Sequence, residues 1–281
     1  MSLRFGTVGA PQKTPKPGTT GAIEYIREIG LDAFEIAWVQ SVRVTDASCA
    51  QMKAAAQAKD VRLSVHAPYY INLNSQTADL MGKSDERLLT AARKGFLAGA
   101  TDIVFHPGSY HGQPPEEVYQ RAKDKLIELT EILRGEGVHV TLRPETMGKS
   151  AMFGTLEETI RLSREVEGVA PCIDVAHLHA RTGNGTFNSY DEFAAMLTLL
   201  RDGLGIERGL HSLHVHISGI EYTARGERNH VMLEESDLAW REFLRACHDF
   251  DVRGSVVCES PTQEDDALLL QAAWRAISAE Q

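Results

Sequence analysis

The stretch Val61-Arg62-Leu63-Ser64-Val65-His66 is a short apolar run that ends in an imidazole. The same arrangement recurs along the chain, where His106 follows Ile103-Val104-Phe105 and Glu259 follows Val256-Val257-Cys258. Runs of this length and composition are typical of buried strands. Because the carboxyl ends of parallel strands converge on one mouth of a barrel, the pattern predicts a functional site at that mouth.

Strand and helix signals alternate from end to end. The expected strands are 3–8, 33–36, 61–65, 102–105, 138–142, 171–173, 213–215 and 255–258. The expected helices are 19–29, 47–59, 85–98, 115–133, 155–165, 190–200, 237–249 and 265–278. Eight strand–helix units in 281 residues predict one α/β TIM barrel as a single domain over residues 1–281. Its long strand-to-helix connections, 67–84, 107–114, 179–189 and 217–236, are expected on the active face.

Composition limits the class of protein. Hydrophobic residues make up 43% of the chain, enough for a large core, and no apolar run is long enough to span a membrane. The chain starts with an expected strand rather than a secretory signal, and its four cysteines have no CxxC spacing. We therefore expect an intracellular, cytoplasmic protein with no membrane partner, and a monomer.

The formal net charge is −10, which by itself disfavours nucleic acid as a partner. Acidic residues that bind cations, however, contribute to this count, and bound cations reverse the local sign of the potential. A cationic face on an acidic protein is therefore compatible with the composition.

The residues that follow the expected strands form a set of imidazoles and carboxylates. Its members are His66, His106, Glu145, Asp174, His177, His216, His230 and Glu259. Zinc and manganese both suit such ligands, and one ion needs three or four of them. Eight candidates on one rim therefore predict a site for two or three ions. We expect His214, in contrast, to face the helices on the other side of its strand.

At this point the sequence resembles the endonuclease IV family, zinc-dependent apurinic/apyrimidinic endonucleases of DNA base-excision repair. Six short motifs carry the resemblance, in order along most of the chain. They are Ser64-Val65-His66-Ala67-Pro68-Tyr69 with Ile71-Asn72-Leu73, His106-Pro107-Gly108-Ser109, Glu145-Thr146, Cys172-Ile173-Asp174-Val175-Ala176-His177, His216-Ile217-Ser218 and Glu259-Ser260. Each motif is short, and their specificity comes from the combination.

The resemblance implies three zinc ions. His66 and His106 would hold the first ion, and Glu145 would bridge it to a second. Asp174, His216 and Glu259 would complete the second ion, and His177 would hold the third with His230 and a carboxylate.

Two departures mark the chain as a divergent branch of that family. The family has an Asp-x-His pair near the third ion, whereas this sequence reads Glu227-Arg228-Asn229-His230, with Glu227 as the candidate carboxylate. Thr146 also stands where the commonest family form has asparagine after the glutamate.

The resemblance implies hydrolysis of the phosphodiester 5′ to an abasic site in double-stranded DNA. Glu145 would orient the nucleophile as well as bind metal. Tyr69 and Tyr70 match the family residues that probe the minor groove and fill the space of a flipped-out nucleotide. Arg43 is a further candidate for insertion into the duplex, and Arg181 is one of several rim cations that either contact phosphates or are solvated.

Two other functions remain open. Sugar isomerases and epimerases with xylose-isomerase-like barrels hold one divalent ion with Glu, Asp, His and Glu, a pattern that Glu145, Asp174, His216 and Glu259 also satisfy. Such a single-ion enzyme does not need His66, His106 and His230 as ligands, whereas a multinuclear hydrolase does. The third possibility is a metal-dependent nucleic-acid binder that has lost cleavage.

Overall fold

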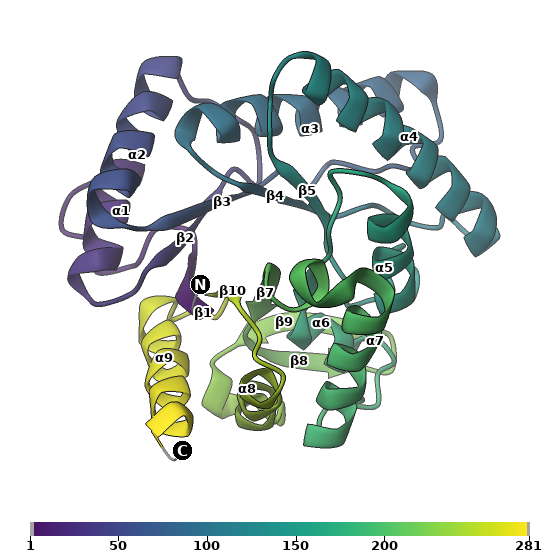
Figure 1. Cartoon of the computed structure of the whole chain (residues 1–281). Coiled ribbons are helices and arrows are strands. Elements are labelled where there is room, and N and C mark those ends of the chain that lie inside the picture. Colours follow the sequence, from purple (N-terminus) through teal and green to yellow (C-terminus); the bar gives the residue numbers. More distant parts are fainter. Residues whose placement is uncertain (1–2, 280–281) are drawn as a thin grey trace.

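The computed structural model describes residues 3–279 and shows a barrel of eight parallel strands (Figure 1). The strands are β1 (Leu3–Val8), β2 (Ala33–Ala37), β3 (Arg62–His66), β4 (Asp102–Phe105), β5 (Thr141–Pro144), β6 (Cys172–Asp174), β7 (Leu213–Ile217) and β10 (Gly254–Cys258). They are hydrogen-bonded in the order β5-β4-β3-β2-β1-β10-β7-β6. A parallel bridge between Glu145 and Cys172 joins the two ends of this sheet, so the barrel is nearly closed.

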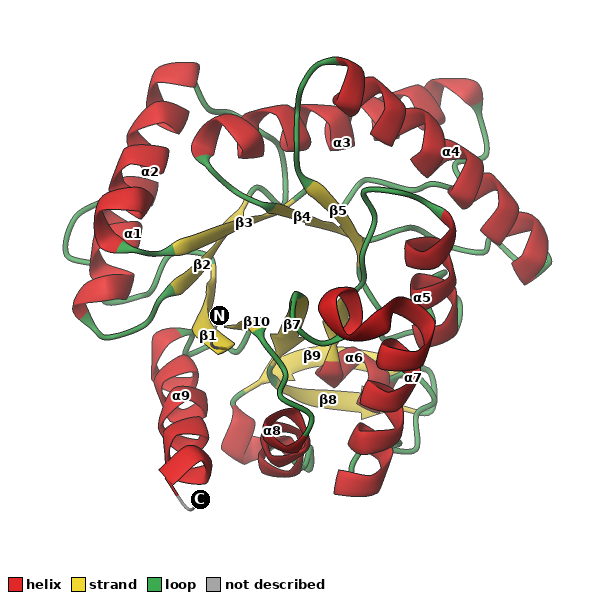
Figure 2. Ribbon diagram, in the orientation of Figure 1, coloured by secondary structure: helices red, strands yellow, loops and turns green. Residues whose placement is uncertain are grey.

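Helices surround the strands (Figure 2). They are α1 (Thr19–Glu28), α2 (Asp46–Lys59), α3 (Ala78–Ala98), α4 (Pro115–Gly135), α5 (Leu156–Glu165), α6 (Val175–Ala180), α7 (Tyr190–Gly209), α8 (Trp240–Asp249) and α9 (Glu264–Ala279). The predicted TIM barrel is confirmed. No helix within residues 3–279 is both long and apolar enough to cross a bilayer.

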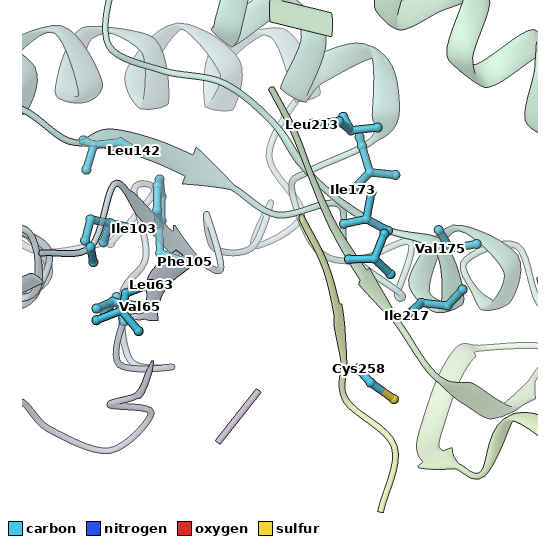
Figure 3. Close-up of a cluster of buried hydrophobic side chains, with 14 of the residues drawn as sticks. Leu63, Val65, Ile103, Phe105, Leu142, Ile173, Val175, Leu213, Ile217 and Cys258 are labelled. Carbon is cyan, nitrogen blue, oxygen red and sulfur yellow. The ribbon is translucent and has the colours of Figure 1, made fainter. Parts of the chain in front are cut away.

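The main hydrophobic core lies between the strands and the helices. Leu63 and Val65 of β3, with Ile103 and Phe105 of β4, are buried in this layer (Figure 3). Because successive strand residues point to opposite faces, the residues that alternate with these four, such as Ser64, face the barrel interior. That interior is unusually polar, and this places the candidate site.

Several element boundaries differ from the sequence-based expectation. Strand β5 begins at Thr141 rather than residue 138, because its pairing with β4 begins where Thr141 meets Asp102. Helix α3 begins at Ala78 rather than residue 85, and the Thr77 side chain caps it by accepting a hydrogen bond from the Leu80 N–H. Helix α7 continues past residue 200 to Gly209, with non-helical geometry at Gly205.

The long connections after β6 and β7 contain elements that the sequence pattern did not predict. Helix α6 follows β6 immediately, and an antiparallel hairpin of β8 (Gly219–Thr223) and β9 (Gly226–Val231) follows β7. A short 3₁₀ turn, Leu233–Glu235, leads from the hairpin toward α8. These insertions bring His177 and His230 to the mouth of the barrel.

Candidate metal centre

Glu145 lies at the centre of the candidate site. It follows β5 directly and is fully buried. Its Oε2 lies 3.3 Å from Nε2 of His66 and 3.4 Å from Nε2 of His106. Three ligand atoms, one from each of these residues, lie within 4.8 Å of one another. The end of β5 and the ends of β3 and β4 thus form a first group that can hold an ion.

Local contacts orient the two imidazoles of this group. Nδ1 of His66 lies 2.9 Å from the backbone oxygen of Ala67, so a hydrogen there donates to that carbonyl and leaves Nε2 facing Glu145. The ring of Tyr69 stacks on His106 with 5.0 Å between ring centres and meets His66 edge-on at 5.2 Å. Tyr69 therefore covers the outer side of the first group.

Four residues from neighbouring strands form a second group. Glu145, Asp174, His216 and Glu259 each offer one atom, and these atoms lie within 4.8 Å of one another. Nδ1 of His216 lies 3.7 Å from Oε1 of Glu145 and 3.6 Å from Oε1 of Glu259. Since Glu145 belongs to both groups, its two oxygens are placed to serve two adjacent ions.

The turn from β6 into α6 explains how Asp174 and His177 reach the same cavity. Asp174 is the N-cap of α6, and its Oδ1 accepts a hydrogen bond of 2.7 Å from the His177 N–H. The Thr146 hydroxyl accepts from the Asp174 N–H at 2.9 Å, and the Thr146 carbonyl lies 2.9 Å from Nδ1 of His177. Thr146 therefore ties the end of β5 to the end of β6.

A third group lies nearer the mouth. Asp174, His177 and His230 each offer one atom within 4.8 Å of the others. Nδ1 of His177 lies 3.4 Å from Oδ2 of Asp174, and the rings of His177 and His230 are 5.4 Å apart. Nδ1 of His230 lies 3.0 Å from the hydroxyl of Ser218, which leaves Nε2 of His230 as the ligand atom.

A β-bulge in the hairpin accounts for the unusual spacing of Glu227 and His230. Glu227 pairs with Tyr222 and His230 with Ile220, while Arg228 is an extra residue in β9. Because Ile220 and Tyr222 are two apart on β8, their partners share one face, although Glu227 and His230 are three apart. Oε2 of Glu227 consequently lies 3.5 Å from Nε2 of His177.

Glu227 approaches this group across Gly148. The Glu227 N–H donates to the Gly148 carbonyl at 2.9 Å. A Cβ at position 148 would lie 2.7 Å from Cβ of Glu227 and 2.9 Å from Cδ2 of His177. Only glycine therefore allows the hairpin to sit this close to α6.

The buried charges in the cluster shift one another's pKa. Burial, reinforced by the nearby Glu145 and Glu259, raises the pKa of Asp174 to about 6. Although burial alone would raise it, the pKa of Glu145 is held well below its usual range by His106 and other imidazoles. Burial opposes the charged form of His177, but Asp174 and Glu145 raise its pKa well above the usual value. The cluster thus retains protons that a cation would displace.

Several buried atoms in the cluster have no hydrogen-bond partner within residues 3–279. They include Oε1 of Glu145, Oδ2 of Asp174 and Nδ1 of His216. Buried polar atoms are nearly always satisfied, so three unsatisfied ones facing the same place need a ligand. Imidazole nitrogen and carboxylate oxygen are the donors that zinc and manganese accept, so the residues fit transition-metal ions.

Sequence reasoning missed Glu35, and it placed His214 wrongly. Glu35 is fully buried on β2, and Nε2 of His214 lies 2.8 Å from its Oε2. His214 therefore faces the barrel interior rather than the helices. The expectation failed because residues two apart on a strand, such as His214 and His216, share a face. An acidic residue inside the apolar strand Ala33–Ala37 was the available signal for Glu35.

The three candidate DNA contacts lie on the rim. Tyr69 and Tyr70 are exposed large aromatic side chains, and the Arg87 guanidinium lies 5.5 Å from the ring centre of Tyr70. Arg43 is exposed and lines a surface pocket with Tyr70. Arg181 donates to the backbone carbonyls of residues 147, 149 and 152, so it holds a loop.

An eight-stranded parallel barrel with clustered imidazoles and carboxylates at its mouth defines the class of protein. Within that class, the chain belongs to the xylose isomerase-like TIM barrel family, whose model matches residues 23–277. This match covers most of the barrel, from α1 to α9.

Relatives of known sequence point to one branch of the family. An uncharacterized protein of Methanocaldococcus jannaschii is 36% identical over 277 residues, which cover 99% of this chain and 98% of that protein. A probable endonuclease 4 of a Geobacillus species is 32% identical over 171 residues, 59% of this chain and 54% of its own length. The resemblance to the endonuclease IV family is confirmed, and the low identity is that of a divergent branch.

Solved structures show the same fold over the whole chain. Endonuclease IV from Thermus thermophilus has a TM-score of 0.73 at 23% identity and covers 99% of this chain and 100% of its own. A D-tagatose 3-epimerase-like protein has a TM-score of 0.75 at 19% identity, with 99% and 98% covered. At such identities the likeness shows the fold alone, and both kinds of enzyme share it.

Proposed function

We propose that this protein is a metal-dependent endonuclease that hydrolyses the DNA phosphodiester 5′ to abasic sites in base-excision repair. One observation carries the proposal. Nε2 of His66 and Nε2 of His106 both lie within 3.4 Å of Oε2 of Glu145, whose other oxygen belongs to the second group. A single-ion enzyme has no use for this additional pair of imidazoles, whereas a hydrolase with adjacent ions needs them.

The residues present would hold two or three zinc ions, with manganese as the alternative metal. His66, His106 and Glu145 would bind one ion, and Glu145, Asp174, His216 and Glu259 a second. When bound, such ions supply charge for the phosphate oxygens and a nucleophile at neutral pH. Glu145 would orient that nucleophile as the catalytic residue.

The third group favours the hydrolase further. Asp174, His177 and His230 cluster within 4.8 Å, and the bulge at Arg228 brings Glu227 to the same side. We propose that Glu227 is the carboxylate partner of His177 and His230 at a third ion. The one-residue insertion in β9 would then compensate for the longer spacing between the carboxylate and the imidazole.

The rim supports DNA as the substrate. Tyr69 stacks on His106, so its ring borders both the exposed surface and the first ligand group. Tyr70 and Arg43 line a neighbouring surface pocket. We propose that Tyr69 and Tyr70 fill the space of a flipped-out nucleotide and that Arg43 contacts the duplex. The protein would act as a monomeric, single-domain barrel in the cytoplasm.

The test uses purified protein, a duplex with one abasic-site analogue, and the same duplex without it. We expect incision 5′ to the analogue only, loss of incision after treatment with a strong chelator, and recovery on adding zinc or manganese. Metal analysis of the same sample should find two or three ions per chain. Absence of incision together with a single bound ion would contradict the proposal.

The second candidate is a sugar isomerase or epimerase. The group Glu145, Asp174, His216 and Glu259 is sufficient for one ion beside a carboxylate pair. A panel of ketoses incubated with the manganese-loaded protein tests it, and turnover of a ketose without DNA incision would favour it. A protein that binds the abasic duplex in a metal-dependent way but never cleaves it would instead be a binder that has lost activity.

A further inference from the structure

Glu35 is a fully buried carboxylate on β2, beneath the candidate metal centre. Its two oxygens have different partners. Oε2 accepts a hydrogen bond of 2.6 Å from the Ser64 hydroxyl and lies 2.8 Å from Nε2 of His214. Oε1 lies 2.9 Å from Nε2 of His216. One oxygen is therefore held by side chains of β3 and β7, and the other faces a candidate metal ligand.

The two ring nitrogens of His216 face different surroundings. Nε2 faces Glu35, while Nδ1 points toward Glu259 and Glu145, whose Oε1 atoms lie 3.6 and 3.7 Å away. Within the part of the chain that the structure describes, neither ring nitrogen of His216 has a partner in hydrogen-bond geometry, and neither does Oε1 of Glu35, so Nε2 and Oε1 are in ion-pair contact at 2.9 Å. Because a neutral imidazole carries hydrogen on one nitrogen, a hydrogen on Nε2 leaves the lone pair on Nδ1 for a cation.

We propose that Glu35 is the positioning residue that makes His216 a metal ligand. The carboxylate holds the hydrogen on Nε2 of His216, fixes the ring plane and presents Nδ1 to the ion of the second group. The inference rests on the metal centre of the proposed function. Metal-bound histidines commonly donate their other N–H to a carboxylate or carbonyl, which orients the ring and raises its basicity.

The other site histidines show why His216 is distinct. His66 and His177 have backbone carbonyls at Nδ1, and His230 has a hydroxyl there. The carboxylates near Nδ1 of His177 and of His230 are themselves members of the ligand groups, whereas Glu35, beside Nε2 of His216, belongs to none of those groups. A charged acceptor strengthens that contact, so His216 should be the most firmly oriented imidazole and the second group the tightest site.

The experiment measures metal affinity rather than turnover. Wild type, Glu35→Met and Glu35→Gln are titrated with zinc against a competing chelator, and the visible spectrum of each cobalt-loaded protein is recorded. Methionine keeps the volume and removes the acceptor, so the affinity for one ion should fall about 10–100-fold and its cobalt spectrum should change. Glutamine keeps an oxygen for Nε2–H, so it should restore affinity to within about threefold of wild type.

Two further variants separate orientation from stability. Ser64→Ala removes a hydrogen bond from the other oxygen of Glu35, so it should lower the free energy of unfolding without changing zinc affinity. Glu35→Asp keeps the charge but shortens the reach to His216, and it replaces Glu35→Met if the latter does not fold. Glu35→Asp should also lower the affinity for one ion.

The outcomes are distinguishable. Wild-type affinity and an unchanged cobalt spectrum in Glu35→Met or Glu35→Asp would overturn the positioning role while leaving the metal centre intact. A wild-type protein that binds no zinc or cobalt would overturn both the metal centre and the role of Glu35. Glu35-dependent metal binding without DNA incision would support the role of Glu35 and contradict only the proposed nuclease.

Discussion

Asp102 and Asp174 are both buried carboxylates on the inner faces of barrel strands, but their surroundings differ. Asp102 lies at the start of β4, where its Oδ1 is 2.5 Å from Nε of Arg143 and its Oδ2 is 3.1 Å from Arg62. Asp174 lies at the end of β6, where Oδ1 caps α6 and Oδ2 has no hydrogen-bond partner within residues 3–279. The first carboxylate is paired with two arginines, whereas the second has only an imidazole beside it and one oxygen without a hydrogen-bond partner.

This difference separates two polar layers of the barrel interior. In the lower layer, Asp102 and Arg143 satisfy each other, and Arg143 also donates to the carbonyls of Pro171 and Ser212 at 2.9 and 2.8 Å. In the upper layer, Glu145 and Asp174 meet imidazoles but no arginine or lysine within hydrogen-bonding distance in the described residues. Buried charge is costly unless it is paired, so the carboxylates of the upper layer are paired either by imidazole protons or by cations that displace those protons.

The largest effect should come from the residue shared by two ligand groups. Glu145→Gln keeps the shape of the side chain but removes the charge that would bind two ions. If the proposed nuclease is correct, incision should fall by about 1,000-fold or more, since a metal supplies several kcal/mol of charge stabilisation. Single-turnover incision and metal counts on the same sample check it. Full activity with all ions bound would contradict the bridging role.

In the lower layer, the same kind of change should damage the fold instead. Asp102→Asn leaves Arg143 buried without its main counter-ion, which should cost about 3–5 kcal/mol of unfolding free energy. Although burial alone would raise it, the pKa of Asp102 is lowered by Arg143 and His214, which shows that the ionised form is the stable one. Urea denaturation at neutral pH measures the loss. A change below about 1 kcal/mol would show that the layer does not depend on this pair.

Metal binding to the upper layer should depend on pH. The pKa of Asp174 is about 6, and that of His177 lies well above its usual value, so both groups hold protons that an ion must displace. Lowering the pH below 6 therefore weakens binding, by about tenfold per pH unit for each proton released. Zinc titrations between pH 5 and 8 measure the slope. A flat profile would show that these two residues are not ligands.

The sequence predicted the order of strands and helices because each β-branched run has the length of a buried strand and each helix has a periodic apolar face. It also identified His66, His106 and Asp174 as members of one rim, because the carboxyl ends of parallel strands must meet. The local sequence pattern and the topology of the barrel determine where these residues lie, and both can be inferred from the sequence.

Other features depended on contacts that no pattern contains. The bulge at Arg228 exists only in the pairing of β8 with β9, so the face shared by Glu227 and His230 could not be read from their spacing. Glu35 lies within a strand and not after its end, and its role depends on His216, which lies on a strand far away in sequence. Helix α6 is too short for a periodic signal, and its start is fixed by the Asp174 cap.

In chelator-treated protein, Asp174→Asn should raise the unfolding free energy, whereas Asp102→Asn should lower it. The folded-state pKa of Asp174 is raised above its ordinary value of 3.8 to about 6, so its ionisation opposes folding at pH 7. Asparagine removes that charge and still caps α6, so the unfolding free energy should rise by about 1–2 kcal/mol. The same variant should bind fewer ions. A destabilised apo-protein would mean that Asp174, like Asp102, is neutralised by the chain.

The smallest effect should come from Gly148→Ala, which tests how far the upper layer extends toward the hairpin. The added methyl group would meet Cβ of Glu227 and Cδ2 of His177, neither of which can rotate away, so β9 must move outward. The third group would then lose Glu227 while it keeps Asp174, and one ion should bind about tenfold more weakly while the two ions around Glu145 are unaffected. Gly135→Ala, where an added Cβ meets nothing within 4 Å, is the matched control. Equal affinities in the two variants would place Glu227 outside the metal centre and confine the unpaired charge to Glu145 and its neighbours.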